Sequence, residues 1–126
     1  MDHEEINRIT IILPWPDSRL MPNRKNGRHW GTTQALKVKA KREGYFSALA
    51  AMNGRPLEIS ERVHVRVTFV APDRRARDLD NLLACIKPQL DGIAKAVGVD
   101  DKLFRPITID DAVDTKGEGF MIVEIG

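Results

Sequence analysis

The sequence has a single cysteine, Cys85, among 126 residues, which excludes an intramolecular disulfide. Cys85 lies among apolar residues, so we expect a buried small hydrophobic side chain and not a reactive thiol. The chain also lacks an apolar run long enough to span a bilayer, and it lacks a basic leader followed by an apolar core and a cleavage site. These absences predict a cytoplasmic protein.

Several common catalytic patterns are missing as well. The sequence contains no phosphate-binding glycine loop, no Ser/His/Asp arrangement and no internal repeat. His64 has no second histidine or cysteine at metal-ligand spacing, so we interpret it as a solvated strand residue. A net charge of +2, with 30% charged and 42% hydrophobic residues, is typical of an ordinary globular domain. The distribution of charge is therefore more informative than its sum.

Positive charge gathers in two stretches. The first lies in residues 17–31, where prolines and glycines predict a loop, and the second comes directly before an acidic motif. A long loop of this kind either grips DNA, lies over a metal site or is a solvated surface segment. The basic residues that we assign to nucleic-acid binding are Arg24, Lys25, Arg28, Arg74, Arg75 and Arg77.

The second basic stretch leads into Asp-Leu-Asp-Asn at residues 78–81. Asp78 and Asp80 are two residues apart, so on an extended backbone their side chains leave on the same side, which suits sharing a hard cation. From Leu79 onward, apolar residues recur at three- and four-residue steps, which predicts an amphipathic helix. On one continuous helix, Asp80 and Lys87 face the same way.

Two residues interrupt or end this helix. Pro88 removes a backbone donor, so we expect a kink or a local break there, and Gly98 ends the helix. The return that follows brings in Asp100 and Asp101. If the helix lies back across a sheet, this second acidic pair meets the first.

A carboxylate set of this kind fits magnesium or manganese, which prefer oxygen ligands and take only one or two carboxylates per ion. Asp78, Asp80 and Asp101 supply the carboxylates, and Lys87 stabilises the transition state or orients the attacking water. Hydrolysis or transfer at a phosphodiester needs such an assembly. The competing interpretation is structural: Asp78 or Asp80 caps a helix, Asp100 and Asp101 are turn residues, and Lys87 is a solvated charge.

The rest of the chain predicts a small α+β domain over residues 1–126, with a mixed or antiparallel sheet of about four strands and two main helices. A hairpin is expected to join the last two strands. The first main helix is expected to begin at Thr32 or Thr33 and to end near Met52. The expected strands lie at residues 9–13, 63–70, 107–113 and 120–125.

Three further side chains have two interpretations each. Trp15, between two prolines, either packs against the following loop or stacks on a base or sugar, and we favour packing. Asp110 and Asp111 resemble further ligands, but at strand positions we interpret them as edge or surface charges.

Taken together, these motifs resemble the RusA family of Holliday junction resolvases, which are phage-derived bacterial endonucleases. With the C-terminal strands included, the resemblance covers most of the chain. It is carried, in order, by Leu13-Pro14-Trp15-Pro16, Arg77-Asp78-Leu79-Asp80-Asn81-Leu82, Lys87-Pro88-Gln89-Leu90-Asp91-Gly92 and Asp100-Asp101.

The resemblance implies a homodimer that cuts four-way DNA junctions by paired nicks in recombination and repair, using magnesium or manganese. It implies catalytic and metal-binding roles for Asp78, Asp80 and Asp101. We assign Asn81 and Asp100 to the surroundings of the ion, where Asn81 orients a carboxylate or a metal-bound water.

The catalytic lysine departs from the family pattern. In the family it follows the asparagine by three residues, a position that Ala84 occupies here, and Lys87 comes three residues later. Three residues are nearly one helical turn, so Lys87 keeps roughly the same facing about 4.5 Å further along the axis. We assign the family's role to Lys87.

Two other functions stay open at this point. One is a branched-DNA binding module that has lost cleavage, which the displaced lysine makes conceivable. The other is a metal-dependent hydrolase of small phosphorylated molecules, which would show no salt-sensitive DNA affinity.

Overall fold

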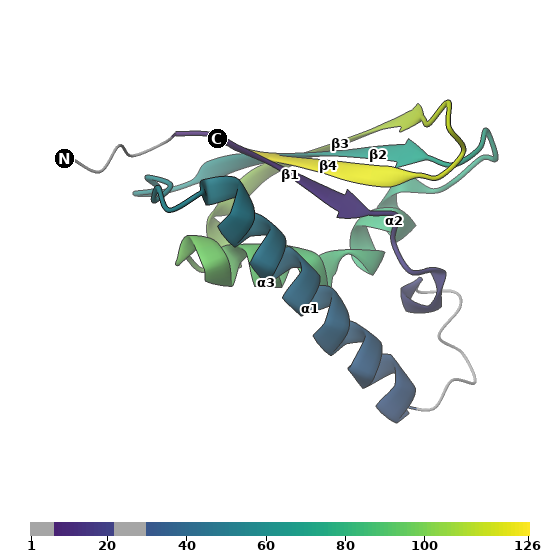
Figure 1. The fold of residues 1–126 in the computed structure, drawn as a ribbon, viewed down its shortest axis with the longest axis horizontal. Helices are drawn as coiled ribbons and strands as arrows, with labels where there is room; N and C mark the ends of the chain where they lie inside the picture. Colours follow the sequence, from purple (N-terminus) through teal and green to yellow (C-terminus); the bar gives the residue numbers. More distant parts are fainter. Residues whose placement is uncertain (1–6, 22–29) are drawn as a thin grey trace.

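The chain folds into one four-stranded sheet whose described helices all lie on the same face (Figure 1). The computed structural model describes residues 7–21 and 30–126, and their arrangement confirms the predicted α+β domain. The elements are β1 (Ile9–Pro14), the 3-10 helix η1 (Ser18–Leu20), α1 (Trp30–Met52), β2 (Val63–Ala71), α2 (Leu79–Cys85), α3 (Lys87–Val97), the 3-10 helix η3 (Asp101–Leu103), β3 (Phe104–Val113) and β4 (Phe120–Ile125).

The strands lie side by side in the order β1, β4, β2, β3. β4 is antiparallel to both of its neighbours, and β2 is parallel to β3. The predicted hairpin of the last two strands is therefore wrong, because β3 and β4 lie on opposite sides of β2.

Burial explains why the last strand takes an inner place. β4 alternates, and its inward residues Met121, Val123 and Ile125 are fully buried, as a strand with two neighbours requires. β3 instead carries Asp110 and Asp111 and is exposed along most of its length. The interpretation of these two aspartates as edge charges is confirmed, because β3 is an edge strand.

Two glycines bring α1 and α3 into close contact beneath the sheet. A Cβ atom at Gly44 would collide with the backbone carbonyl of Gln89, and one at Gly92 would collide with the carbonyl of Lys41. The helix backbones therefore touch where these glycines meet. The core that they close contains Ile9, Ile11, Leu13, Ala48, Met52, Val65, Val67, Phe69, Leu90, Ile93, Met121, Val123 and Ile125.

The helix that follows the acidic motif is broken in two. α2 ends at Cys85, Ile86 leaves the helical conformation at φ −98° and ψ 7°, and α3 starts with Pro88 in its first turn, where no backbone donor is needed. This confirms the break predicted near Pro88. Gly98 ends α3 in the left-handed conformation at φ 87°, also as predicted.

The break changes the geometry expected of the site. The common facing of Asp80 and Lys87 assumed a continuous helix, whereas the two residues begin different helices that point in different directions (Figure 1). A single helical wheel therefore does not relate them.

Candidate nucleic-acid and metal site

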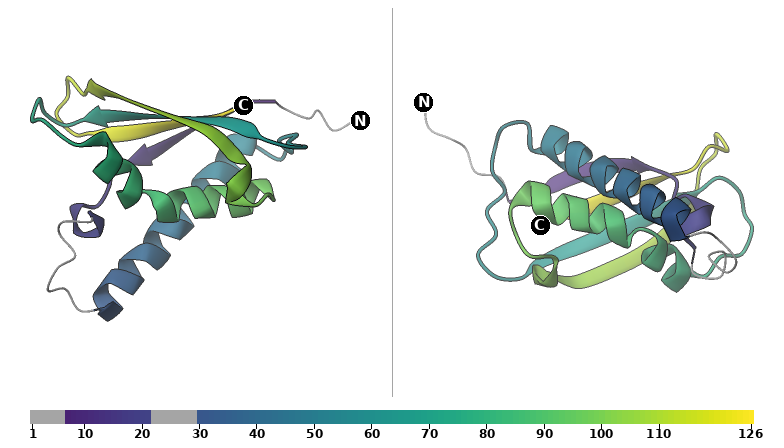
Figure 2. Two further views of the ribbon diagram at one scale, coloured as in Figure 1. Left: turned by 180° about the vertical axis from the view of Figure 1, so that it is seen from behind. Right: turned by 90° about the horizontal axis from the view of Figure 1, so that it is seen from below.

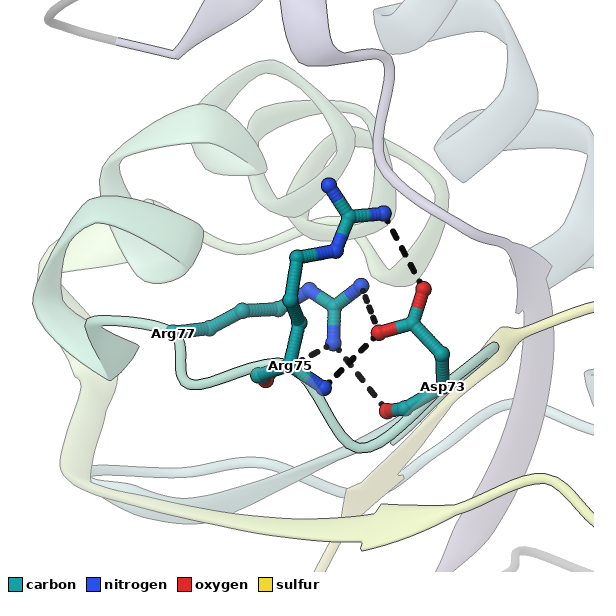
Figure 3. A network of polar contacts seen from close by, with 3 residues as sticks. All are labelled: Asp73, Arg75 and Arg77. Carbon is teal, nitrogen blue, oxygen red and sulfur yellow. Dashed lines mark hydrogen bonds and ion pairs between the residues drawn. The ribbon is translucent and has the colours of Figure 1, made fainter.

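One carboxylate organises the basic loop between β2 and α2 (Figure 3). Asp73 Oδ1 accepts hydrogen bonds from the backbone N–H of Arg75 and from Arg77 Nη2, both at 2.9 Å. Asp73 Oδ2 accepts from Arg75 Nη2 at 3.0 Å. The bonds from Arg75, and then that from Arg77, lower the pKa of Asp73 to about 2.

Arg77 is turned inward. Its guanidinium lies 5.2 Å from the ring centroid of Trp15 and donates to the backbone carbonyls of Asp73 and Arg75 at 3.2 and 3.1 Å. Trp15 in turn packs edge-on against Phe69, with ring centroids 6.3 Å apart. The packing role favoured for Trp15 is thus confirmed, and Arg77 holds the loop against it.

The other two arginines of the loop face outward. Arg74 is exposed, and the Arg75 side chain is 80% exposed although one arm of its guanidinium contacts Asp73. Arg77, by contrast, is only 18% exposed. The three arginines line one rim of a hollow of about 240 Å³ that lies between the loop and the end of β3. Of the three, Arg74 and Arg75 present their charge to solvent.

The first acidic pair begins α2 directly after this loop. Asp78 is the N-cap: its Oδ1 accepts from the backbone N–H of Asp80 at 2.9 Å. The structural interpretation of Asp78 is therefore confirmed. A carboxylate has about four acceptor positions, so this cap leaves it able to bind other groups. Asp78 and Asp80 are both exposed, and Asn81 is half-buried behind them.

The second acidic pair has a different neighbour. Asp100 caps η3 by accepting from the backbone N–H of Lys102 at 3.0 Å. Asp101 lies beside Asp91 on α3. Burial raises the pKa of Asp91, and the interaction with the neighbouring Asp101 raises it further.

Two lysines flank this carboxylate pair. The positive charges of Lys41 on α1 and Lys87 on α3 lower the pKa of Asp91, against the effects of burial and of Asp101. Lys87 also lines a hollow with Asp91 and Lys37. Lys87 therefore lies beside the second acidic pair. The break between α2 and α3 separates it from the first pair.

The predicted site residues thus form two groups. Asp78, Asp80 and the outward arginines lie at the start of α2, while Lys87 and Asp101 lie around Asp91. Within residues 7–21 and 30–126, no group of three or more acidic, histidine or cysteine side chains is arranged to hold a metal ion. Within these residues the two acidic pairs therefore do not form one such group. Three predicted DNA-binding residues, Arg24, Lys25 and Arg28, lie outside the described residues.

Asp73 and Asp91 are the two carboxylates of these groups that the sequence analysis did not assign. The pattern contained a signal for Asp91, which follows Lys87 by four residues and so lies one turn further along the same helix. The signal for Asp73 was weaker, because an aspartate after Pro72 is typical of any turn.

Two other predictions concern residues outside these groups. Cys85 is buried, as expected, with its Sγ 3.2 Å from the carbonyl oxygen of Asp17. His64 is half-buried, and its Nε2 contacts Thr108 Oγ1 at 2.7 Å across β2 and β3. The histidine is therefore engaged on the sheet, away from both acidic groups.

The site defines a class of protein: a small α+β domain that presents exposed carboxylates and arginines where a strand leads into a helix. No protein-family model matches the chain. A Xylella fastidiosa (strain Temecula1) protein, described as uncharacterized, is 36% identical over 114 residues, which cover 86% of this chain and 71% of that protein. The chain belongs to the same family as this protein.

In the part of the chain that the structure describes, no helix combines the length and the apolar character needed to cross a membrane.

Proposed function

We propose that the chain is a magnesium-dependent endonuclease of the RusA type, which resolves four-way DNA junctions in recombination and repair in the cytoplasm. The supporting observation is the start of α2, where exposed Asp78 and Asp80 follow directly on a loop with outward Arg74 and Arg75. Ligands for a hard cation and binding groups for phosphate therefore share one surface. A phosphodiester substrate needs both.

The donor set at α2 fits magnesium or manganese. These ions take one or two carboxylates and complete their octahedron with water and phosphate oxygens, and Asp78 and Asp80 would hold the ion in this way. Bound there, it would supply activation of a water molecule and neutralisation of developing charge. Asn81 lies on the same turn, where its amide orients a carboxylate.

The basic side chains have separate tasks. Arg74 and Arg75 bind the backbone phosphates on either side of the scissile bond, while Arg77 keeps the loop rigid by its contacts with Asp73 and Trp15. Lys87 contributes positive charge to the site from the start of α3.

The separation of Asp101 from Asp78 and Asp80 supports a dimeric enzyme. Because the carboxylates do not meet within one chain, a second copy supplies Asp101 to each site. A four-way junction has approximate two-fold symmetry, so two sites related by a similar axis suit two nicks in opposite strands.

The proposal is tested by strand cleavage of a synthetic four-way junction and of a linear duplex with the same sequence. We expect paired, symmetric nicks in the junction with magnesium, no nicks with a chelator, and a loss of about 100-fold or more in Asp80→Asn. Glu61→Gln is the matched control. It removes an exposed carboxylate from the segment before β2 and should cut normally.

The alternatives give different results in the same assay. Tight, salt-sensitive junction binding without cutting in magnesium or manganese would replace the nuclease with a junction-binding module. The position of Lys87 beside Asp91 favours this second candidate more than any other observation. Absence of salt-sensitive DNA affinity would point instead to a hydrolase of small phosphorylated molecules.

Sharing of the site between two copies has its own test. Asp80→Asn and Asp101→Asn should each be inactive alone. After subunit exchange, a mixed dimer has one site with all three aspartates, so nicking of one strand should return. If each site were complete within one chain, mixing would restore nothing.

A further inference from the structure

The inner face of β3 is unusual among the four strands. Register pairs Ile107 with Val65 and Ile109 with Val67, and paired residues point to the same face of a sheet. Val65 and Val67 are fully buried beneath the helices, whereas Ile107 is 37% exposed and Ile109 only partly buried. Apolar side chains on the core side of the sheet are therefore left uncovered.

The helices explain this exposure. Seen from below in Figure 2, α1 and α3 cross the sheet on the side away from β3, and β3 lies at the edge between η3 at one end and α2 at the other. The opposite edge of the sheet differs, because the inward side chains of β1 are at most 3% exposed. The uncovered surface is thus confined to the β3 edge.

We propose that a second copy of the chain covers this edge by pairing antiparallel with β3, so that the sheet continues from one copy into the other. This inference rests on the dimer in the proposed function and specifies its surface. An edge strand offers a row of backbone donors and acceptors that face away from the sheet, and residues 107–113 of β3 form its regular part, beyond Pro106 and the register shift at its start. The two-fold axis then runs perpendicular to the sheet, and both helix layers lie on the same side.

Symmetry limits the register of this pairing. Directly opposite residues must share a face, so an inward residue faces an inward residue of the partner. The axis must therefore pass beside a residue of β3 and not between two residues. Ile107, Thr108 and Ile109 are the central candidates.

Burial selects among the three. With the axis at Thr108, Ile107 lies opposite the partner's Ile109, whereas an axis at Ile109 would set Ile107 opposite the charge of Asp111. With the axis at Ile107, Ile109 would lie opposite the start of β3, where the register with β2 shifts between Phe104 and Ile107. The axis therefore lies at Thr108, and the start of each β3, with Arg105, then comes close to Asp111 at the end of the other.

This register also covers the exposed apolar residues. Ile107 of each copy lies opposite the partner's Ile109 on the inner face, which forms a four-residue apolar cluster at the axis. On the outer face Thr108 meets its own copy, a pairing that is favourable in antiparallel sheets. Burial of these isoleucines removes the exposed core-side surface.

The same pairing bears on the candidate site. η3 leads into the start of β3, and α2 residues line a hollow with Asp111, Ala112 and Val113 at the end of β3. Antiparallel pairing brings the start of one β3 to the end of the other. Each η3, with Asp101, is thus carried toward the α2 of the other copy, as the proposed function requires.

Light scattering and sedimentation measure the dimer without any reference to cleavage. We expect Arg105→Asp or Asp111→Arg to raise the dimer dissociation constant about 10-fold or more, because each change brings like charges close together at two symmetric positions. The double exchange, Arg105→Asp with Asp111→Arg, restores the opposite charges and should return the constant to within about 3-fold. Circular dichroism of each variant checks that the exposed changes leave the fold intact.

Crosslinking tests the position of the axis. Facing residues have Cβ atoms about 4.5 to 5.5 Å apart, so Thr108→Cys should form a covalent dimer with oxidant or a short bis-maleimide. The matched control is Thr10→Cys on the exposed face of β1, which should stay monomeric under denaturing conditions. The wild type, whose Cys85 is buried, should also stay monomeric.

The outcomes separate the two proposals. A monomer at all concentrations, or a dimer that neither crosslinks through Thr108→Cys nor responds to the charge exchange, would overturn the β3 pairing. A crosslinked dimer that never cuts a junction would retain the pairing and refute the nuclease.

Discussion

Asp73 illustrates how one exposed carboxylate determines the direction of two arginines. It accepts hydrogen bonds from the backbone N–H and from the side chain of Arg75, and it holds Arg77 beneath the loop and over Trp15. Its pKa of about 2 lies below the ordinary value of 3.8, so the folded chain prefers the ionised carboxylate. The stabilisation it gives is present above pH 3.8 and is lost as the pH falls toward 2.

Asp73→Asn should therefore lower the melting temperature at pH 7, and the difference from the wild type should shrink to nothing near pH 2. Thermal unfolding followed by circular dichroism between pH 2 and 7 measures this dependence. Asp110→Asn removes an exposed charge from the β3 edge and serves as the control. An equal difference at both ends of the pH range would show that Asp73 acts through packing and not through its charge.

Asp91 behaves in the opposite way. Burial and the contact with Asp101 raise its pKa, so its ionisation opposes folding. The folded state gains stability from Asp91 below its unfolded pKa and loses this gain as the pH rises through the raised value. Asp91→Asn should stabilise the chain at pH 7 by about 0.5 kcal/mol or less, because solvent screens an exposed group.

The same pH series tests this prediction. The extra stability of Asp91→Asn should disappear below about pH 3.8, the ordinary pKa of aspartate, because residue 91 is then uncharged in the wild type as well as in the variant. A stabilisation that persists in acid would have to come from the amide's own hydrogen bonds.

The site could be predicted from the sequence only where its geometry is local. The spacing of Asp78 and Asp80 predicted neighbouring carboxylates, and the two residues do share the first turn of α2. The contact of Asp101 with Asp91 depends instead on where η3 lies after α3, which no local pattern specifies. The expected meeting of the acidic pairs failed within one chain for that reason.

At the scale of elements, the packing of α1 against α3 depends on two missing side chains. A methyl group at Gly44 or Gly92 would meet backbone atoms of the opposite helix, and backbone cannot rotate away as a side chain can. The helices would have to separate, and the core beneath them would loosen.

Gly44→Ala and Gly92→Ala should each destabilise the domain by about 1 to 3 kcal/mol, against their favourable effect on helix propensity. Urea unfolding gives the free energies. Lys39→Ala on the exposed face of α1 is the control and should change stability by less than about 0.5 kcal/mol. An increase in stability for either glycine variant would show that a methyl group fits between the two helices without moving them.

Strand existence was predictable, but strand neighbours were not. The alternation of apolar residues indicated residues 63–70 and 120–125 as strands, and β2 and β4 occupy these positions. The hairpin prediction assumed that consecutive strands pair. Asp111 lies on the inner face of β3 in register with Phe69, and this charge disfavours a central place for β3, so β4 pairs with β2 instead.

At the scale of the whole molecule, a net charge of +2 gives little general attraction to DNA, so affinity must depend on local groups. Arg74 and Arg75 point outward from the loop, and Arg77 does not. Each phosphate contact contributes about 0.9 to the slope of log affinity against log salt.

Arg74→Ala and Arg75→Ala should each reduce this slope by about one and weaken junction and duplex binding alike. Arg77→Ala should change the slope less and lower the melting temperature more, because its contacts are with Asp73 and Trp15. Fluorescence anisotropy with labelled DNA at several salt concentrations separates these effects. Equal slopes for all three variants would mean that Arg77 also reaches phosphate.

The position of β4 in the sheet has a consequence for biosynthesis. β4 comes last among the strands, yet it lies between β1 and β2 and is the direct partner of β1. While the ribosome is still making the chain, β1 emerges first and has no strand to join until β4 follows. The order of synthesis thus leaves the apolar inward side chains of β1 without their partner strand until β4 has been made.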